Sequence, residues 1–200
     1  MHISEGILSA PVLISGAAVT IAGTSIGLKR LDMDRIMGTS ILTAAFFVAS
    51  LIHVPIGPAS IHLVLNGLLG VILGWACFPA ILVGLLLQAI FFQYGGLLVL
   101  GVNTANMALP ALLCFYLVRP MLQKPQTRPM AGFIAGAGAI ILASVCMALS
   151  LALSDSGFLT TAKLTVLANL PIMLIEGVIT MFTVSFLARV HPELLAGIDL

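Results

Sequence analysis

Residues 61–93 read IHLVLNGLLGVILGWACFPAILVGLLLQAIFFQ and contain no Asp, Glu, Lys or Arg. A helix that crosses the hydrocarbon core of a bilayer needs about 20 apolar residues, so this stretch is typical of a membrane protein. It is either one long tilted helix, interrupted near Phe78-Pro79, or two short helices over Ile61–Trp75 and Cys77–Gln93. The choice between them sets the number of spans and the orientation of the chain.

The remainder of the chain has the same apolar character. Only 8% of its 200 residues are charged and 60% are hydrophobic, whereas roughly 25% of residues are charged in a typical globular domain. A soluble fold of this size cannot bury so much apolar surface. We therefore expect one membrane domain over residues 1–200. The net charge of +1 argues against electrostatic binding of nucleic acid, which needs clustered Lys and Arg.

Charge placement decides how the spans are counted, because cytoplasmic loops concentrate Lys and Arg. Other apolar runs predict spans over Ile7–Gly27, Ile36–Ile52, Thr104–Val118, Met130–Leu153 and Leu164–Ala188. Two helices over residues 61–93 put seven of the eight basic residues on one side and leave only Lys163 on the other. We predict an all-α bundle of seven transmembrane helices in the cytoplasmic (inner) membrane, with the N-terminus outside and the C-terminus in the cytoplasm.

The chain start is predicted to be retained. Glu5 precedes the first apolar run and Lys29-Arg30 follow it, whereas a secretory signal peptide carries its basic residues first. A cleaved signal peptide remains the alternative, favoured by the Ala-rich stretch over residues 16–22. Glycine pairs four residues apart, such as Gly23/Gly27, Gly70/Gly74 and Gly132/Gly136, predict close helix packing inside the bundle.

Polar residues within such a chain need an explanation, because a bilayer makes each of them costly. The candidates are His2, His53, His62, Glu176 and the amides Asn66, Gln88, Gln93, Asn103, Asn106 and Asn169. A lone histidine is more often a solvated or capping residue than a metal ligand. Glu176, inside the last predicted helix, is either a structural partner across the bundle, a coupling element or a support for a nearby site.

His2 stands out because it adjoins the α-amine of Met1. The amine, the amide nitrogen of His2 and its imidazole Nδ1 can grip one metal ion in a single plane, once the amide loses its proton. A fourth nitrogen completes a square-planar set, which is diagnostic of Ni(II) or Cu(II). Both His62 and His53 are candidates for it, since each is predicted on the outer face. Asn66, one helical turn after His62, could hold the second nitrogen of that imidazole.

The opening Met1-His2-Ile3-Ser4-Glu5-Gly6 resembles the start of the CbiM/NikM family, the substrate-binding membrane subunits of energy-coupling-factor transporters for cobalt and nickel. Further matching motifs follow in order: Val54-Pro55-Ile56-Gly57, Ser60-Ile61-His62-Leu63, Asn66-Gly67, Leu87-Gln88-Ala89, Gly95-Gly96-Leu97, Gly101-Val102-Asn103, Asn106-Met107 and Pro171-Ile172-Met173-Leu174-Ile175-Glu176-Gly177. Their order and approximate spacing extend the resemblance over nearly the whole chain.

The resemblance implies a seven-helix bundle whose extracellular N-terminus tucks inward onto the metal. It implies Met1, His2 and His62 as the ligands, with His53 as the second choice for the distant histidine. The groups that could hold these ligands in place are Ser60, Asn66, Gln93, Asn103 and Glu176. The transported substrate would be Ni(II) or Co(II), with nickel slightly favoured because planar nitrogen coordination suits it.

The same resemblance implies partners and argues against catalysis. We expect a transmembrane coupling subunit, a pair of cytoplasmic ABC-type ATPases and a small accessory membrane subunit, all on separate polypeptides. The chain has no GxxxxGK[ST] phosphate loop, so it is not expected to hydrolyse ATP itself. A vitamin-binding subunit or a passive channel on the same scaffold is the alternative, but it leaves Met1-His2 without a purpose. An intramembrane hydrolase would need an orienting carboxylate beside Ser60 and His62, and none is recognisable.

Overall fold

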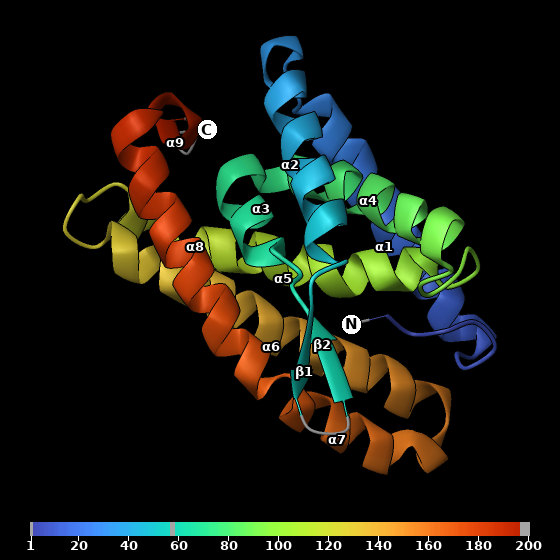
Figure 1. The fold of residues 1–200 in the computed structure, drawn as a ribbon. Coiled ribbons are helices and arrows are strands. Elements are labelled where there is room, and N and C mark those ends of the chain that lie inside the picture. Colours follow the sequence, from blue (N-terminus) through green and yellow to red (C-terminus); the bar gives the residue numbers. More distant parts are fainter. Residues whose placement is uncertain (1, 57–58, 197–200) are drawn as a thin grey trace.

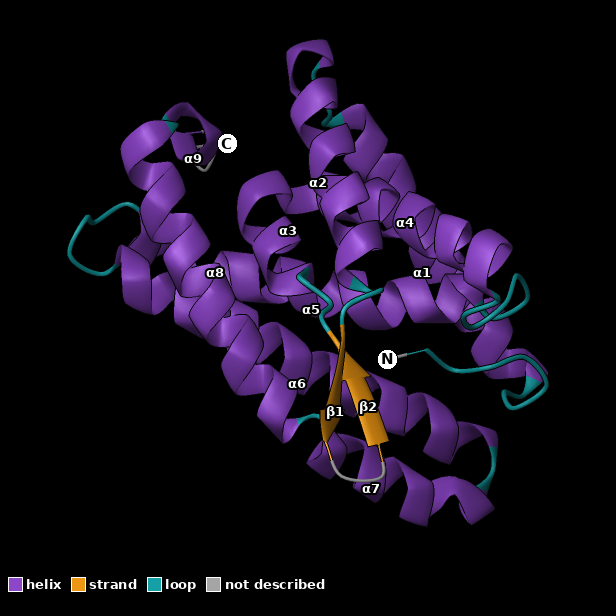
Figure 2. Cartoon of the chain, in the orientation of Figure 1, coloured by secondary structure: helices purple, strands orange, loops and turns teal. Residues whose placement is uncertain are grey.

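The computed structural model of the chain describes residues 2–56 and 59–196. It is mostly helical, and Figures 1 and 2 show one bundle of crossing helices with a short hairpin projecting from it. The helices are α1 (Ala10–Lys29), α2 (Ile36–Ala49), α3 (Asn66–Leu73), α4 (Cys77–Phe92), α5 (Leu100–Leu122), α6 (Arg128–Ser154), α7 (Leu159–Ala168), α8 (Leu170–Val190) and α9 (Glu193–Ala196). The strands are β1 (His53–Ile56) and β2 (Ala59–His62).

The helices have the lengths and composition of a multi-pass membrane protein. Five helical segments are long and apolar enough to cross a bilayer, and they are Ala10–Lys29, Asn66–Phe92, Leu100–Leu122, Arg128–Ser154 and Ser156–Val190. The predicted number of seven spans is not confirmed. With 14 residues in α2 and 8 in α3, these helices are shorter than the roughly 20 residues that a full crossing takes.

The apolar stretch over residues 61–93 is folded as two helices, as the charge placement predicted. Gly74, with a φ of 53°, ends α3 in a left-handed conformation that glycine adopts without a steric penalty. The His2 ring lies 5.2 Å from that of His62 and 5.8 Å from that of Tyr94. His62 and Tyr94 flank the segment Asn66–Phe92, so the two ends of this segment lie close to each other. A single straight helix of that length would separate them by about 40 Å. The chain therefore runs out through α3 and back through α4.

The first of these helices begins later than predicted, which corrects the placement of His62. The sequence predicted a helix from Ile61, but residues 59–62 pair with residues 53–56 in an antiparallel hairpin, and α3 starts at Asn66. Leu65 adopts a left-handed φ of 56°, which a helix interior does not accommodate. His62 therefore ends a strand, and Asn66 does not share a helix face with it. The hairpin also departs from the all-α prediction.

The last predicted helix, over Leu164–Ala188, is also interrupted. α7 ends at Ala168 and α8 begins at Leu170, with Pro171 in its first turn. A proline has no N–H to donate to the preceding turn, so a helix starts easily at this position but does not run through it. The 35-residue segment Ser156–Val190 thus bends before α8 enters the bundle.

Glycines allow close contact where helices of the bundle cross, both in α6, which contains Gly136, and in α1, which contains Gly23. A Cβ atom on Gly136 would lie 2.5 Å from the carbonyl oxygen of Glu176 in α8, and one on Gly23 would lie 2.4 Å from the ring of Phe78 in α4. Both distances are far below van der Waals contact, so these glycines are required where the helices cross. The predicted role of Gly23/Gly27 and Gly132/Gly136 in packing within the bundle is confirmed. Gly74 instead ends α3.

Candidate metal site

The N-terminal segment enters the bundle and is held there by Asn103 at the start of α5. The backbone N–H of Ile3 donates to Asn103 Oδ1 at 3.1 Å, and Asn103 Nδ2 donates to the carbonyl oxygen of Ile3 at 3.1 Å. Both residues are buried. Buried backbone groups away from water need partners, and a single amide side chain supplies both. The two bonds fix the chain one residue after His2.

Further contacts tie the same segment to the loop between α4 and α5. Glu5 Oε1 accepts a hydrogen bond from the backbone N–H of Leu98 at 3.0 Å. Gly95, with a φ of 77°, has no room for a side chain, because a Cβ atom there would lie 2.8 Å from Asn103 Nδ2. Figure 2 shows these two teal segments next to each other. The loop therefore covers the chain start closely.

The structure brings His2 and His62 together, although 59 residues separate them in the sequence. Their rings are parallel to within 10°, with centroids 5.2 Å apart. The ring of Tyr94, from the loop between α4 and α5, stacks with His2 at 5.8 Å and within 18° of parallel. Met1, the remaining predicted ligand, lies outside the described residues. Two of the three predicted ligand residues are thus neighbours.

The hydrogen bonding of His62 determines which of its nitrogens can bind an ion. His62 Nδ1 lies 3.0 Å from the carbonyl oxygen of Leu63. A carbonyl oxygen only accepts, so Nδ1 must carry the proton at this contact. When the ring is neutral, its lone pair is then on Nε2, and this arrangement is common in metal-binding histidines. In this tautomer, Nε2 is the nitrogen of His62 that can bind a metal ion.

His2 is kept neutral by its surroundings. Burial, followed by the positive charges of the α-amine and of His62, lowers the pKa of the His2 imidazole from 6.5 to about 2. No proton then competes with a metal ion for this ring near neutral pH. His2 Nε2 is buried and has no hydrogen-bond partner among the described residues. A buried nitrogen without a partner calls for an explanation such as a water molecule; the predicted chelate uses the other ring nitrogen of His2, Nδ1.

Glu176 of α8 anchors the turn that follows His62. Its carboxylate accepts hydrogen bonds from the backbone N–H groups of Val64 and Leu65, with distances of 2.9 and 3.0 Å from the Leu65 nitrogen to the two oxygens. The side chain is fully buried, and a carboxylate in such a place must be compensated. Glu176 is therefore a structural partner across the bundle, placed two residues from a candidate ligand.

The other residues predicted near the site are placed differently. Asn66 is buried, and its side chain bonds to the carbonyl oxygen of Met107 at 3.2 Å and to the backbone N–H of Gly67 at 3.0 Å, so it is not seen holding the His62 imidazole. Gln93 is exposed and ends α4 with a left-handed φ of 57°. His53 pairs with His62 and Ser60 with Pro55 in the hairpin register; the side chains of His53 and Ser60 lie outside the described part.

Side chains of the described residues do not by themselves make a complete donor set. Within the described residues there is no group of three or more His, Cys, Asp or Glu side chains that could hold a metal ion. His2 and His62 supply two imidazole nitrogens. A complete four-nitrogen shell would therefore need main-chain nitrogens, which the chain start can provide.

One neighbour of the site was missed by the sequence analysis. Tyr94 contacts His2, yet a single tyrosine in a loop carries no local signal of a metal site. Only its position before Gly95-Gly96, a matching motif of the resemblance, could have drawn attention to it.

Comparisons with known proteins agree on the class of protein. Residues 2–194 match the family CbiM, described as the cobalt uptake substrate-specific transmembrane region. A protein of Haemophilus influenzae named "Putative metal transport protein" is 41% identical over 200 residues, covering 98% of this chain and 97% of its own. The fused nickel transport protein NikMN of Rhodobacter capsulatus is 40% identical over 114 residues, covering 54% of this chain and 33% of its own.

A solved structure has the same fold. The crystal structure of a transition metal transporter superposes with a TM-score of 0.81 at 28% identity, covering 95% of this chain and 93% of that one.

Replacing Asn103 by Ala should undock the chain start. The N–H and C=O of Ile3 would lose their partners inside the bundle, at a cost of about 1–3 kcal/mol each. We expect the Ile3 amide to lose most of its protection in hydrogen exchange measured on the purified protein. Asn169→Ala is the matched control, because the Asn169 side chain donates to the carbonyl oxygen of Thr165, one turn earlier in the helix, at 2.9 Å. Full protection of Ile3 in the Asn103 variant would contradict the assignment.

Proposed function

The chain belongs to the CbiM family, and from this premise we propose that it is the metal-capturing subunit of an energy-coupling-factor importer for Ni(II) or Co(II). The family is a cobalt and nickel transport component and not an enzyme family, which sets aside the intramembrane hydrolase. Gly23-Thr24-Ser25-Ile26-Gly27 does match the letters GxSxG, but it lies inside α1. A nucleophile elbow requires a strand-to-helix turn.

The observation that carries the proposal is the meeting of His2 and His62 at a buried chain start. We propose that the α-amine of Met1, the amide nitrogen and Nδ1 of His2, and Nε2 of His62 ligate one ion. The neutral His2 ring and the donor role of His62 Nδ1 support this assignment. Asn103 and Glu176 then hold the two halves of the ligand set from two different helices, α5 and α8.

Nickel is the metal that this donor set favours over cobalt. Four nitrogens in one plane are diagnostic of Ni(II) or Cu(II), and three of the proposed four belong to one short chelate made by the first two residues. Cu(II) would bind still more tightly by the general order of divalent metals, so its exclusion in the cell must depend on availability. A vitamin-binding site would not need the parallel pair of His2 and His62.

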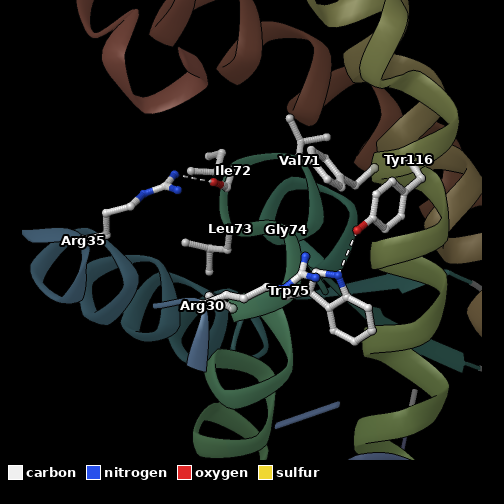
Figure 3. Close-up of a pocket in the computed structure, with 10 residues that line it drawn as sticks. Arg30, Arg35, Val71, Ile72, Leu73, Gly74, Trp75 and Tyr116 are labelled. Atoms are coloured by element: carbon white, nitrogen blue, oxygen red, sulfur yellow. Dashed lines mark hydrogen bonds between the residues drawn. The ribbon is translucent and has the colours of Figure 1, made fainter. Parts of the chain in front are cut away.

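The distribution of charge supports the predicted orientation. Seven of the eight basic residues are placed by the sequence at one end of the helices, and Arg30 and Arg35 line a pocket around Trp75, where α3 ends (Figure 3). Arg35 donates to the carbonyl oxygen of Ile72 at 3.3 Å, and Arg30 lies over the Trp75 ring. α1, about 30 Å long, separates Arg30 from the N-terminal segment. We propose that the basic end faces the cytoplasm.

With this orientation, we propose seven crossings. α1, α2, α3, α4, α5, α6 and the α7–α8 segment would alternate between the two ends; α3 is short and buried among its neighbours, whereas α2 is short and exposes many of its side chains. The metal site lies at the outer end. We propose that a transmembrane coupling subunit and a pair of cytoplasmic ABC-type ATPases reorient the bundle to release the ion inward, with a small accessory membrane subunit in the same assembly.

Removal of His62 tests the ligand set. His62→Ala should weaken Ni(II) binding by more than the roughly ten- to hundredfold loss typical of groups around a metal site, because a ligand itself is lost. The affinity is measured by competition with a chromophoric chelator on full-length protein whose retained Met1 is verified by mass spectrometry. His191→Ala is the control, since this exposed histidine follows α8 at the other end of the bundle.

One insertion makes the same test more specific. A leucine placed between Met1 and His2 adds a second amide nitrogen and, because it is bulky, leaves Met1 in place, so the chain start alone would supply four nitrogens. We expect this insertion to restore nickel binding to the His62→Ala protein. Unchanged affinity after His62→Ala, or no rescue by the insertion, would overturn the proposed ligand set.

Glu176 should matter to metal binding through the turn that it anchors. Glu176→Ala leaves the N–H groups of Val64 and Leu65 without their carboxylate, and we expect Ni(II) affinity to fall by roughly tenfold or more. Glu176→Gln keeps one acceptor oxygen and should have an intermediate effect. The control is Thr180→Val, one turn further along α8, because the buried Thr180 hydroxyl has no hydrogen-bond partner among the described residues. Equal nickel affinities in the Ala and Val variants would show that Glu176 does not position the ligand.

A further inference from the structure

A small polar pocket lies at the basic end of the bundle, where α3 ends. Its volume is about 60 Å³. A cavity for one water molecule needs roughly 10–15 Å³, so this pocket has room for several water molecules or for one phosphate group. Among the described residues that line it, Arg30 and Arg35 are the only charged ones, and Figure 3 shows them on two different sides of the pocket.

Both arginines keep N–H donors for an anionic ligand. Arg35 donates to the carbonyl oxygen of Ile72 at 3.3 Å, and the guanidinium carbon of Arg30 lies 5.5 Å from the centre of the Trp75 ring. A guanidinium has five N–H donors and stays charged at all ordinary pH values, so neither contact exhausts it. The acidic residues between the two arginines in sequence, Asp32 and Asp34, are exposed and line a neighbouring groove instead of the pocket.

The aromatic residues of the pocket are typical of a bilayer surface. Trp75 Nε1 donates to the hydroxyl oxygen of Tyr116 at 2.8 Å, and the hydroxyl keeps its own proton to donate to another acceptor. Tryptophan and tyrosine gather where a membrane meets water, because their rings are apolar and their polar atoms need partners. We therefore expect the pocket to lie at the depth of the phospholipid headgroups.

A larger groove adjoins the pocket and has a different chemical character. Its volume is about 730 Å³, and it shares Arg35, Ile72 and Leu73 with the pocket. The walls that come from α2, α8 and α9 are mainly apolar, with Met37, Ile41, Leu42, Leu187 and Leu194. The two cavities together thus offer cationic donors at one end and an apolar channel next to them.

We propose that the two cavities bind one anionic phospholipid, with its phosphate between Arg30 and Arg35 and one acyl chain along the groove. Basic pockets between transmembrane helices select anionic over zwitterionic headgroups through their charge. The adjoining apolar groove favours a lipid over a free phosphate ion. The inference is independent of the proposed metal binding, because none of these residues belongs to the candidate metal site.

The only tryptophan of the chain is Trp75, so tryptophan fluorescence reports on lipid bound at this site. Full-length protein is reconstituted in vesicles that mix phosphatidylcholine with phosphatidylglycerol, and bromine atoms on the chains of one lipid or the other quench the fluorescence. Each signal is normalised to the same protein in unbrominated lipid. We expect phosphatidylglycerol to bind next to Trp75 roughly tenfold or more tightly than phosphatidylcholine, since each arginine contributes about fivefold.

Two double variants carry the same change of charge. Arg30→Gln/Arg35→Gln should bring the two lipids to nearly equal affinity. Lys29→Gln/Lys124→Gln removes two exposed charges that line neither cavity and should retain the preference. If thermal unfolding shows that the arginine double variant does not fold, Arg30→Gln alone keeps the bond from Arg35 to Ile72 and should lower the preference about fivefold.

Three outcomes would overturn the proposal. Equal quenching by the two brominated lipids in the native protein would exclude a selective lipid site and leave the arginines for an acidic protein partner. Equal loss of the preference in both double variants would show only a general attraction of the basic end for anionic membranes. Loss of the preference in millimolar inorganic phosphate would show that the pocket takes free phosphate. None of these outcomes bears on nickel binding.

Discussion

The paired hydrogen bonds between Asn103 and the backbone of Ile3 are the interaction on which the proposed site depends. A chain end normally stays in water, because its backbone groups lose hydration when they are buried. One amide side chain, placed on the first turn of α5, satisfies the N–H and the C=O of the same residue. The chain start can then lie inside a membrane bundle, and His2 is brought to a fixed position next to it.

The proposed ligands are held from two separate directions. Asn103 on α5 positions the chain start, and Glu176 on α8 positions the turn after His62. Both helices pack against α6, where Gly136 permits the close crossing with α8. A change in the angle between these helices would therefore change the distance between His2 and His62. This coupling offers a physical route by which reorientation of the bundle could release the ion.

Much of the architecture could be predicted from the sequence, because apolar runs and charge placement report directly on a bilayer. The division of residues 61–93 into two helices followed from the positions of the basic residues alone. The hairpin that contains His62 was not predictable in this way, since its strands are short and apolar like the helices around them. The break before Pro171 was missed because prolines in first turns and in kinks look alike in sequence.

Within the site, the pattern of the first two residues predicted a chelate, the expected outer-face placement made His53 and His62 candidates for the fourth ligand, and the family resemblance favoured His62. The roles of Asn103 and Glu176 depend on contacts across 100 and 112 positions in sequence, which no local pattern reveals. Tyr94 is a ring in a glycine-rich loop, and only the fold places it against His2. Long-range packing therefore accounts for the part of the site that the sequence left open.

The central claim is that the α-amine of the first residue ligates the metal, and modification of that amine tests it most directly. Acetylation near neutral pH is selective for the α-amine, because lysine side chains stay protonated there. The account predicts that nickel-loaded protein loses its planar absorption spectrum and most of its Ni(II) affinity after acetylation, while its thermal unfolding stays unchanged. Nickel binding with an unaltered spectrum in the acetylated protein would contradict the account.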